Sequence, residues 1–235
     1  MAFASLDKAM PTDEYKQIAL DTFNNIIKRK NNTKGVYNKS YPGTRILKNF
    51  SLPMILCNLS LELEHILGKE KVDEFIPSII HEVMDVFYHP DLGLVLENVN
   101  EDGSFCDSFE GRLLNPGHAI EAMWFIMDLG KRINDEKLIE KAKDIMLHTL
   151  EYGWDKEYEG IFYFLDVKGC PPQQLEWDQK LWWVHVEALV ALAKGYALTA
   201  DENCLRWFEK VHEYTWNKFK DEEYGEWFGY LNRRG

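Results

Sequence analysis

The sequence predicts an all-α protein built from repeated helical hairpins with short β-hairpins in the connecting loops. A short turn motif recurs four times, and each interval between copies holds two helix-length amphipathic stretches. The copies are Lys34–Tyr37, Asp91–Leu96, Asp155–Phe164 and Asp221–Tyr230, whose glycines Gly35, Gly93, Gly160 and Gly225 are 58, 67 and 65 residues apart. A nearly constant period of this size is typical of repeat architectures, in which each unit packs against its neighbours.

Apolar residues at three- and four-residue spacing predict the first three helices. The first covers about 12–29, with its apolar stripe over Tyr15–Ile27. The second starts near Leu52 and stops at Gly68, a residue type that often ends helices. The third covers about 72–87.

Four more helices follow along the chain. The fourth opens at Asn115-Pro116, because Asn is a strong N-cap and Pro favours the first helical position. The fifth, sixth and seventh cover about 135–152, 175–198 and 202–219. The sixth is apolar or aromatic around most of its circumference, so we expect it to be buried on most sides. Such a helix fits the inner layer of a closed ring better than the alternative, an open superhelix.

Composition favours one folded domain over residues 1–235. No low-complexity segment or Pro/Gly linker divides the chain, and apolar residues make up 46% of it. The net charge is −12, and no basic patch stands out. Both features argue against nucleic acid and anionic membrane surfaces as partners.

The cysteines and the N-terminal residues indicate a cytoplasmic protein. Cys57, Cys106, Cys170 and Cys204 are too widely spaced for a zinc site or a disulfide framework, so we expect reduced thiols and no metal. No apolar run reaches the roughly 18 residues that a membrane span needs. Residues Met1–Met10 lack the layout of a secretory signal.

His118 is the first candidate for chemistry, because it falls in the first turn of the fourth helix. The positive end of the helix dipole disfavours a second positive charge, so we expect a neutral imidazole that can act as a general base. Glu121 lies on the same face and is placed to orient the ring or to bind a hydroxyl. Arg112, just upstream, can hold an anionic oxygen. The alternative is an ordinary helix start with a surface histidine.

The sixth predicted helix carries a polar stripe of Glu176, Lys180, Trp183 and Glu187. Glu176 and Lys180 are expected to form a simple i,i+4 ion pair. Trp183 and Glu187 suit a sugar ring, which stacks its C–H face on an indole while a carboxylate binds its hydroxyls. His185 lies off the stripe and is expected to be a packed, locally hydrogen-bonded side chain.

The fourth copy of the turn motif places Glu226 beside Trp227. This segment is either a plain hairpin with aromatic cross-strand pairs or a pocket rim where Glu226 binds substrate. Phosphate-binding glycine loops and local Ser/His/Asp signatures are missing from the sequence.

Three motifs in order resemble the N-acylglucosamine 2-epimerase family, which includes an animal enzyme also called renin-binding protein. They are Gly111–Ala122, Leu175–Trp177 with Lys180–Ala188, and Glu223–Leu231. The resemblance covers nearly all of the chain. It implies an (α/α)6 barrel of six helical hairpins and an isomerase that interconverts N-acetylglucosamine and N-acetylmannosamine. It also implies that no redox cofactor is required and that ATP acts as an activator rather than as a reactant.

The resemblance further implies roles for individual residues. His118 matches one of the family's two catalytic histidines, and Glu121 matches its partner in the sugar site. Trp183 and Glu187 match sugar-contacting positions, and Arg112 is a candidate on the same grounds. Cellobiose epimerases carry a histidine where Met54 falls, which favours an N-acyl hexosamine as the substrate.

The chain also departs from the family pattern. Family members are longer at both ends, and their second catalytic histidine belongs to a later Cys-Phe-His-x-Pro-Arg segment. Seven predicted helices form only part of a twelve-helix ring, so we expect little or no epimerase activity from this chain alone. The alternatives are an aldose–ketose isomerase, a cellobiose-type 2-epimerase, or an inactive fragment that acts as an interaction module or homodimer through its exposed apolar flanks.

Overall fold

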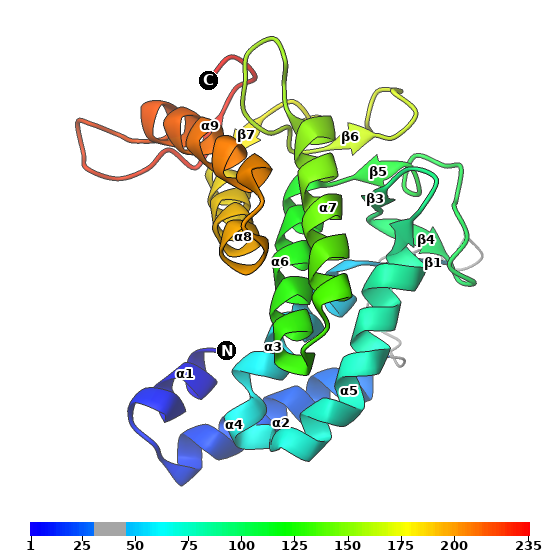
Figure 1. Cartoon of the computed structure of the whole chain (residues 1–235), viewed down its shortest axis with the longest axis vertical. Helices are drawn as coiled ribbons and strands as arrows, with labels where there is room; N and C mark the ends of the chain where they lie inside the picture. Colours follow the sequence, from blue (N-terminus) through cyan, green and yellow to red (C-terminus); the bar gives the residue numbers. More distant parts are fainter. Residues whose placement is uncertain (31–45) are drawn as a thin grey trace.

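Helical hairpins that stand side by side make up the fold (Figure 1). The computed structural model describes residues 1–30 and 46–235. Two N-terminal helices, α1 (Ala2–Ala9) and α2 (Asp13–Arg29), precede three units that each contain a helix pair. The predicted all-α class with short strands in the connections is therefore confirmed.

Each unit pairs an inner helix with an outer one. The first unit contains α3 (Ser51–Glu62), α4 (Glu64–Leu67), α5 (Lys69–His81) and the π-helical turn η1 (Glu82–Phe87). The second contains α6 (Pro116–Ile133) and α7 (Glu136–Gly153), and the third α8 (Trp182–Thr199) and α9 (Glu202–Lys218). Helix α6 packs against both α3 and α8, whereas α5, α7 and α9 pack mainly on the inner helix of their own unit.

Short antiparallel strand pairs close each unit at one end. Strand β1 (Leu47–Asn49) pairs with β4 (Asn98–Asn100), β5 (Leu113–Leu114) with β6 (Leu165–Asp166), and β7 (Lys180–Leu181) with β8 (Tyr230–Leu231). In every pair one strand leads into the inner helix and the other follows the outer helix. The inner helices α6 and α8 therefore begin beside the connecting loops. A further hairpin joins β2 (Tyr88–His89) to β3 (Leu94–Val95).

The repeated motif is a tight turn that depends on its glycine. Gly93, Gly160 and Gly225 have φ of +68°, +76° and +75°. Side chains other than hydrogen are strained in that region, so the glycines recur. Asp155 and Asp221 open the last two copies, and each accepts two backbone N–H groups on its Oδ1. The first predicted copy, Lys34–Tyr37, lies outside the described residues.

Most predicted helix positions are confirmed. Helices α2, α7 and α9 match the predicted ranges within one residue, and α6 begins at Pro116 as predicted. The second predicted helix is divided into α3 and α4 by a turn at Leu63. The third ends in η1 rather than in a regular α-helical turn. Helix α1 was not predicted.

The prediction for the start of the sixth helix is wrong. Residues 175–178 form turns, Lys180 belongs to β7, and α8 begins only at Trp182. The expected ion pair between Glu176 and Lys180 is absent, because Lys180 Nζ instead contacts Asp155 Oδ2 at 3.1 Å. From Trp182 onward the prediction of an inner helix is confirmed, since α8 packs against α6, α7 and α9.

The ion pair between Lys180 and Asp155 is fully buried, with side chains 0% and 1% exposed. Arg233 Nε donates a further hydrogen bond to Asp155 at 2.9 Å, and Lys180 Nζ lies 3.8 Å from the centre of the Phe162 ring. Burial raises the pKa of Asp155, but hydrogen bonds from Arg233, the Glu157 amide and Lys180 lower it to about 2. Through these contacts, Asp155 in the third turn motif is linked to Lys180 in β7 and to Arg233 near the C-terminus.

In the part of the chain that the structure describes, the thiols of Cys57, Cys106, Cys170 and Cys204 form no disulfide bonds. Cys106 Sγ lies 3.3 Å from Ser108 Oγ. Within residues 1–30 and 46–235, every helix is too short or too polar to cross a lipid bilayer.

Replacing Asp155 is expected to destabilise the protein strongly. Asp155→Ala leaves the Lys180 ammonium buried without its partner, which costs about 3–5 kcal/mol in comparable sites. Urea unfolding followed by circular dichroism measures the loss. Glu222→Gln is the control, because it breaks the exposed pair with Lys220 and should cost less than about 1 kcal/mol. Equal losses in the two variants would contradict the assigned role of the buried pair.

The same carboxylate predicts a pH dependence. The pKa of Asp155 is lower in the folded state than the value of about 4 for an unfolded chain, so ionised Asp155 stabilises the fold above that pH. This contribution is lost as the pH falls through about 2. Urea midpoints between pH 5 and pH 2 should therefore converge for the wild type and Asp155→Asn. A difference that stays constant over this range would show that Asp155 is not the group that titrates.

Candidate active site

The first turn of α6 places His118 against α8. Asn115 caps the helix, its Oδ1 accepting the His118 N–H at 3.2 Å, and Pro116 takes the first helical position, as predicted. A Cβ atom on Gly117 would lie 2.7 Å from the Trp183 ring, so only glycine permits this close approach. The rings of His118 and Trp183 lie 5.5 Å apart, centre to centre, at 36°.

Glu97 holds the other side of the His118 ring. The Nδ1 atom of His118 lies 3.0 Å from Glu97 Oε1, and the two side chains are 28% and 10% exposed. Glu97 comes from the loop between β3 and β4 of the preceding unit. The sequence analysis did not identify Glu97 as a site residue. The sequence offers two signals for Glu97: it is an acidic residue directly after the apolar run Leu94–Leu96, and the segment Leu96–Val99 resembles the family pattern.

The expectation of a neutral His118 is wrong in direction. Burial lowers the pKa of His118, but the hydrogen bond and charge of Glu97, with the charge of Glu121, raise it above its ordinary value. The expectation that Glu121 orients the ring is corrected as well, because the carboxylate that contacts the ring nitrogen is that of Glu97. Glu121 acts on His118 through its charge.

Two carboxyl groups from neighbouring helices lie close together beside His118. Burial, followed by the charge of Glu187, raises the pKa of Glu121 to about 7, although His118 opposes this shift. Glu187 accepts a hydrogen bond of 2.8 Å from the Trp124 indole N–H. Burial raises the pKa of Glu187, although the hydrogen bond from Trp124 lowers it. The structure therefore brings His118, Glu121, Trp183 and Glu187 together, as the sequence predicted.

Tyr163 is a second member of the cluster that the sequence analysis missed. Its ring meets Trp183 edge to face, with the ring centres 6.4 Å apart. Burial raises the pKa of Tyr163, and the charges of Tyr230, Glu176 and Glu97 add to this effect. Tyr163 belongs to the third copy of the turn motif, so the cluster draws on two successive connecting loops.

Arg112 is occupied by structural contacts. Its Nε donates to Asp166 at 2.9 Å and its Nη1 to Asp107 at 3.0 Å, and its guanidinium lies 5.2 Å from the centre of the Phe109 ring. These contacts link the loop before β5 to β6. The guanidinium N–H groups that do not contact Asp166 or Asp107 could still bind a substrate oxygen. That role of Arg112 stays a prediction.

Glu226 lies in a different place from the His118 cluster. It is exposed and lines a hollow of about 480 Å³ together with Trp182, Val186, Trp216 and Trp227. Trp182 and Val186 belong to α8 but follow a different stripe from Trp183. The same segment forms an antiparallel bridge between Lys220 and Trp227, so it is a hairpin that also borders a hollow. Substrate binding by Glu226 stays a prediction.

His185 is a packed histidine, as predicted. It is fully buried, its Nε2 accepts the Ile161 N–H at 3.0 Å, and its Nδ1 donates to the Leu181 carbonyl at 2.7 Å. Burial lowers its pKa to about 3, so the ring is neutral.

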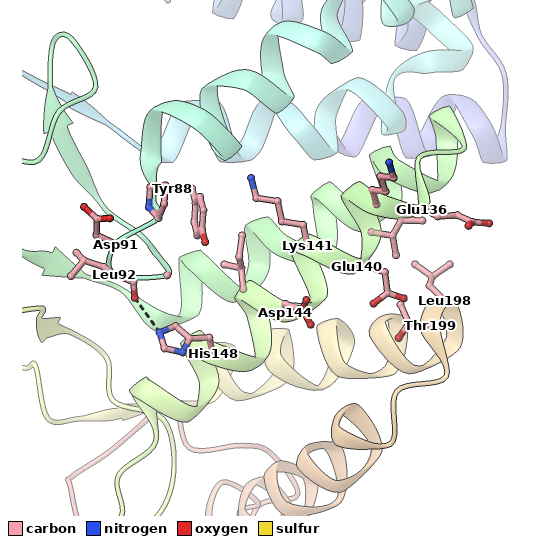
Figure 2. Close-up of a pocket in the computed structure, with 15 residues that line it drawn as sticks. Tyr88, Asp91, Leu92, Glu136, Glu140, Lys141, Asp144, His148, Leu198 and Thr199 are labelled. Atoms are coloured by element: carbon pink, nitrogen blue, oxygen red, sulfur yellow. Dashed lines mark hydrogen bonds between the residues drawn. The ribbon is translucent and has the colours of Figure 1, made fainter.

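A large hollow of about 1130 Å³ lies elsewhere, on the outer side of the fold (Figure 2). It is lined by α7, by the turn around Leu92 and by the end of α8. His148 Nε2 contacts the Leu92 carbonyl at 3.1 Å, and Lys141 Nζ lies 5.0 Å from the centre of the Tyr88 ring. None of the predicted site residues lines this hollow, so we place the candidate active site at the His118 cluster.

Coupling between the two carboxyl groups is testable. Glu187→Gln removes the charge that faces Glu121, so the pKa of Glu121 is expected to fall from about 7 toward its ordinary value. Carbon-13 NMR titration of the carboxyl groups measures the shift. Glu209→Gln, on the exposed side of α9, is the matched control and should leave Glu121 unchanged. An unchanged pKa of Glu121 in Glu187→Gln would contradict the coupling.

Known proteins with similar sequences include sugar epimerases. The sequence model of the N-acylglucosamine 2-epimerase family matches residues 1–235. The N-acylglucosamine 2-epimerase of Bos taurus is 38% identical over 244 residues, and that of Homo sapiens is 37% identical over 243. Each match covers 100% of this chain and 56% of the relative. The chain thus spans about half the length of these relatives.

A solved structure confirms the fold class. The cellobiose 2-epimerase from Bacillus thermoamylovorans matches with a TM-score of 0.78 at 20% identity, over 98% of this chain and 61% of that one. At this identity the likeness concerns the fold, which is the predicted (α/α)6 barrel of helical hairpins. With the sequence match over its whole length, the chain belongs to the N-acylglucosamine 2-epimerase family.

Proposed function

We propose that this chain carries the His118 side of a sugar 2-epimerase site that interconverts N-acetylglucosamine and N-acetylmannosamine. One observation carries the proposal. A partly exposed imidazole, His118, lies between a buried carboxylate, Glu97, and an indole ring, Trp183. This arrangement combines a proton-transfer group with a platform for a sugar ring.

The chemistry needs only proton transfers. In the opened sugar, the C2 hydrogen lies next to the C1 aldehyde and can leave as a proton. The electron pair of the C–H bond then forms the C1–C2 double bond of an enolate whose negative charge lies on the C1 oxygen, and a proton delivered to the opposite face of C2 gives the epimer. His118 accepts the proton in one direction of the reaction and delivers it in the other.

The neighbouring groups suit a 2-acetamido sugar. The Trp183 indole offers an apolar face to the C–H side of the sugar, and Glu121 and Glu187 offer oxygen atoms to its hydroxyls. With a pKa of about 7, Glu121 is partly protonated at neutral pH, so it can donate as well as accept a hydrogen bond. A donor near C1 would stabilise the charge that develops on the C1 oxygen of the enolate.

His118 serves one face of the substrate. Inversion at C2 needs proton transfer on both faces, and the histidine on the neighbouring inner helix, His185, has both ring nitrogens engaged. We therefore propose that this chain, by itself, has little or no epimerase activity.

Further properties of the chain belong to the same proposal. The enzyme requires no cofactor for the chemistry, ATP acts as an activator, and the protein is cytoplasmic. The net charge of −12 supports the exclusion of nucleic acid and anionic membranes as partners. A homodimer is the proposed assembly, and the exposed Trp182 and Trp216 side chains support it.

Sugar binding and C2 exchange test the proposal. Titration with N-acetylmannosamine is expected to shift the NMR signals of His118 and Trp183 saturably, and Trp183→Ala should abolish the shift at His118. Trp207→Ala, at another half-buried indole, on α9, is the control and should bind normally.

In D2O, deuterium is expected to enter C2 slowly, and His118→Asn should remove that exchange. Exchange that persists in His118→Asn would contradict the role of His118. Mannose and cellobiose, assayed in parallel, distinguish the N-acyl hexosamine from the substrates of the alternative enzymes.

A further inference from the structure

We infer that Glu97 is the positioning residue of the site: it holds the Nδ1–H of His118, so that Nε2 is the atom that exchanges protons with the substrate. The inference deepens the proposed function and rests on it only where turnover is concerned. The ring geometry can be tested without any activity.

The backbone of Glu97 is held on two sides. Its N–H donates to the Leu113 carbonyl at 3.3 Å, and its carbonyl accepts the Phe50 N–H at 3.0 Å. Leu113 belongs to β5, which leads into α6 and His118, whereas Phe50 precedes α3. The carboxylate is therefore presented from a point that two units share.

The contact assigns the proton on the His118 ring. An ionised carboxylate can only accept hydrogen bonds, so the Nδ1 atom that lies 3.0 Å from Glu97 Oε1 must carry the hydrogen. The bond made by one ring nitrogen sets the role of the other. Neutral His118 therefore has its lone pair on Nε2, and protonated His118 delivers its proton from the same atom.

Other groups also face this ring, and they define the alternatives. Glu121 on α6 adds its charge, while Trp183 on α8 brings an uncharged ring. Glu187 reaches His118 only through Glu121, and Tyr163 faces Glu97. Of the two carboxylates that act on His118 directly, Glu97 makes the hydrogen bond. If Glu121 oriented the ring instead, its removal would change which nitrogen carries the proton.

Nitrogen-15 NMR of histidine-labelled protein tests the inference. The chain has seven histidines, and His118→Asn identifies the His118 signals by their loss. At high pH, wild-type His118 is expected to carry its proton on Nδ1. Glu97→Gln should keep this tautomer, because the amide oxygen accepts the same bond, but should lower the pKa of His118 because the charge is gone. Glu97→Ala should lose the tautomer as well.

Asp85→Asn is the matched control. It changes a second histidine–carboxylate pair, in which His81 Nδ1 lies 2.8 Å from Asp85 with both side chains more than half exposed. This variant should leave the tautomer and titration of His118 unchanged. Glu97→Gln preserves the shape of the side chain, so it reports on the charge even if Glu97→Ala does not fold.

Two results would overturn the inference. One is an unchanged His118 titration in Glu97→Gln. The other is a change of the His118 tautomer in Glu121→Gln but not in Glu97→Ala, which would assign the ring orientation to Glu121. Neither result depends on epimerase activity, so a failure of the inference is distinguishable from a failure of the proposed function.

Turnover supplies a second readout. Wherever C2 exchange is measurable, Glu97→Gln is expected to lower kcat by about 10- to 100-fold with little change in KM, as partners that orient reactive groups typically do. The limb of the pH profile that reports on His118 should move to lower pH. A raised KM with unchanged kcat would instead assign Glu97 to sugar binding and overturn the positioning role.

Discussion

The contact between the first turn of α6 and the start of α8 determines where the candidate active site lies. It depends on Gly117, whose missing side chain lets the Trp183 ring approach the helix backbone. Because the Asn115 cap sets where α6 begins, His118 faces the same indole. The site is thus a consequence of how two inner helices pack, with the loops adding Glu97 and Tyr163 from the sides.

The electrostatics of the site follow from crowding acidic groups beside one histidine. Glu121 and Glu187 come from facing helices, and burial together with their mutual repulsion disfavours two negative charges. Glu97 is nearly buried as well, but it has the His118 ring as a partner. The cluster therefore divides its carboxyl groups by role. Glu97 is paired with the imidazole, whereas burial raises the pKa of the other two carboxyl groups, that of Glu121 to about 7.

Local patterns predicted the parts of the fold that depend on neighbouring residues in the chain. The cap at Asn115, the start of α6 and the turn glycines all follow from short-range rules, and the structure confirms them. The start of α8 does not follow from short-range rules, because the side chain of Lys180 forms a buried ion pair with Asp155, which lies 25 residues away in the chain. Local patterns did not identify Glu97 as a site residue for the same reason, because its partner His118 lies in the next unit.

The raised pKa of His118 shows how such a tertiary contact overrides a local rule. A helix N-terminus interacts with a nearby charge by about 0.3–1 kcal/mol. A full opposite charge at about 4 Å contributes about 4 kcal/mol near a protein surface, because the effective dielectric constant there is roughly 20. The carboxylate of Glu97 outweighs the helix end by a wide margin. The pKa of an imidazole at the start of a helix therefore depends on whether the fold brings a carboxylate to it. In this family member the preceding loop does, and the pKa of His118 is raised although burial opposes the shift.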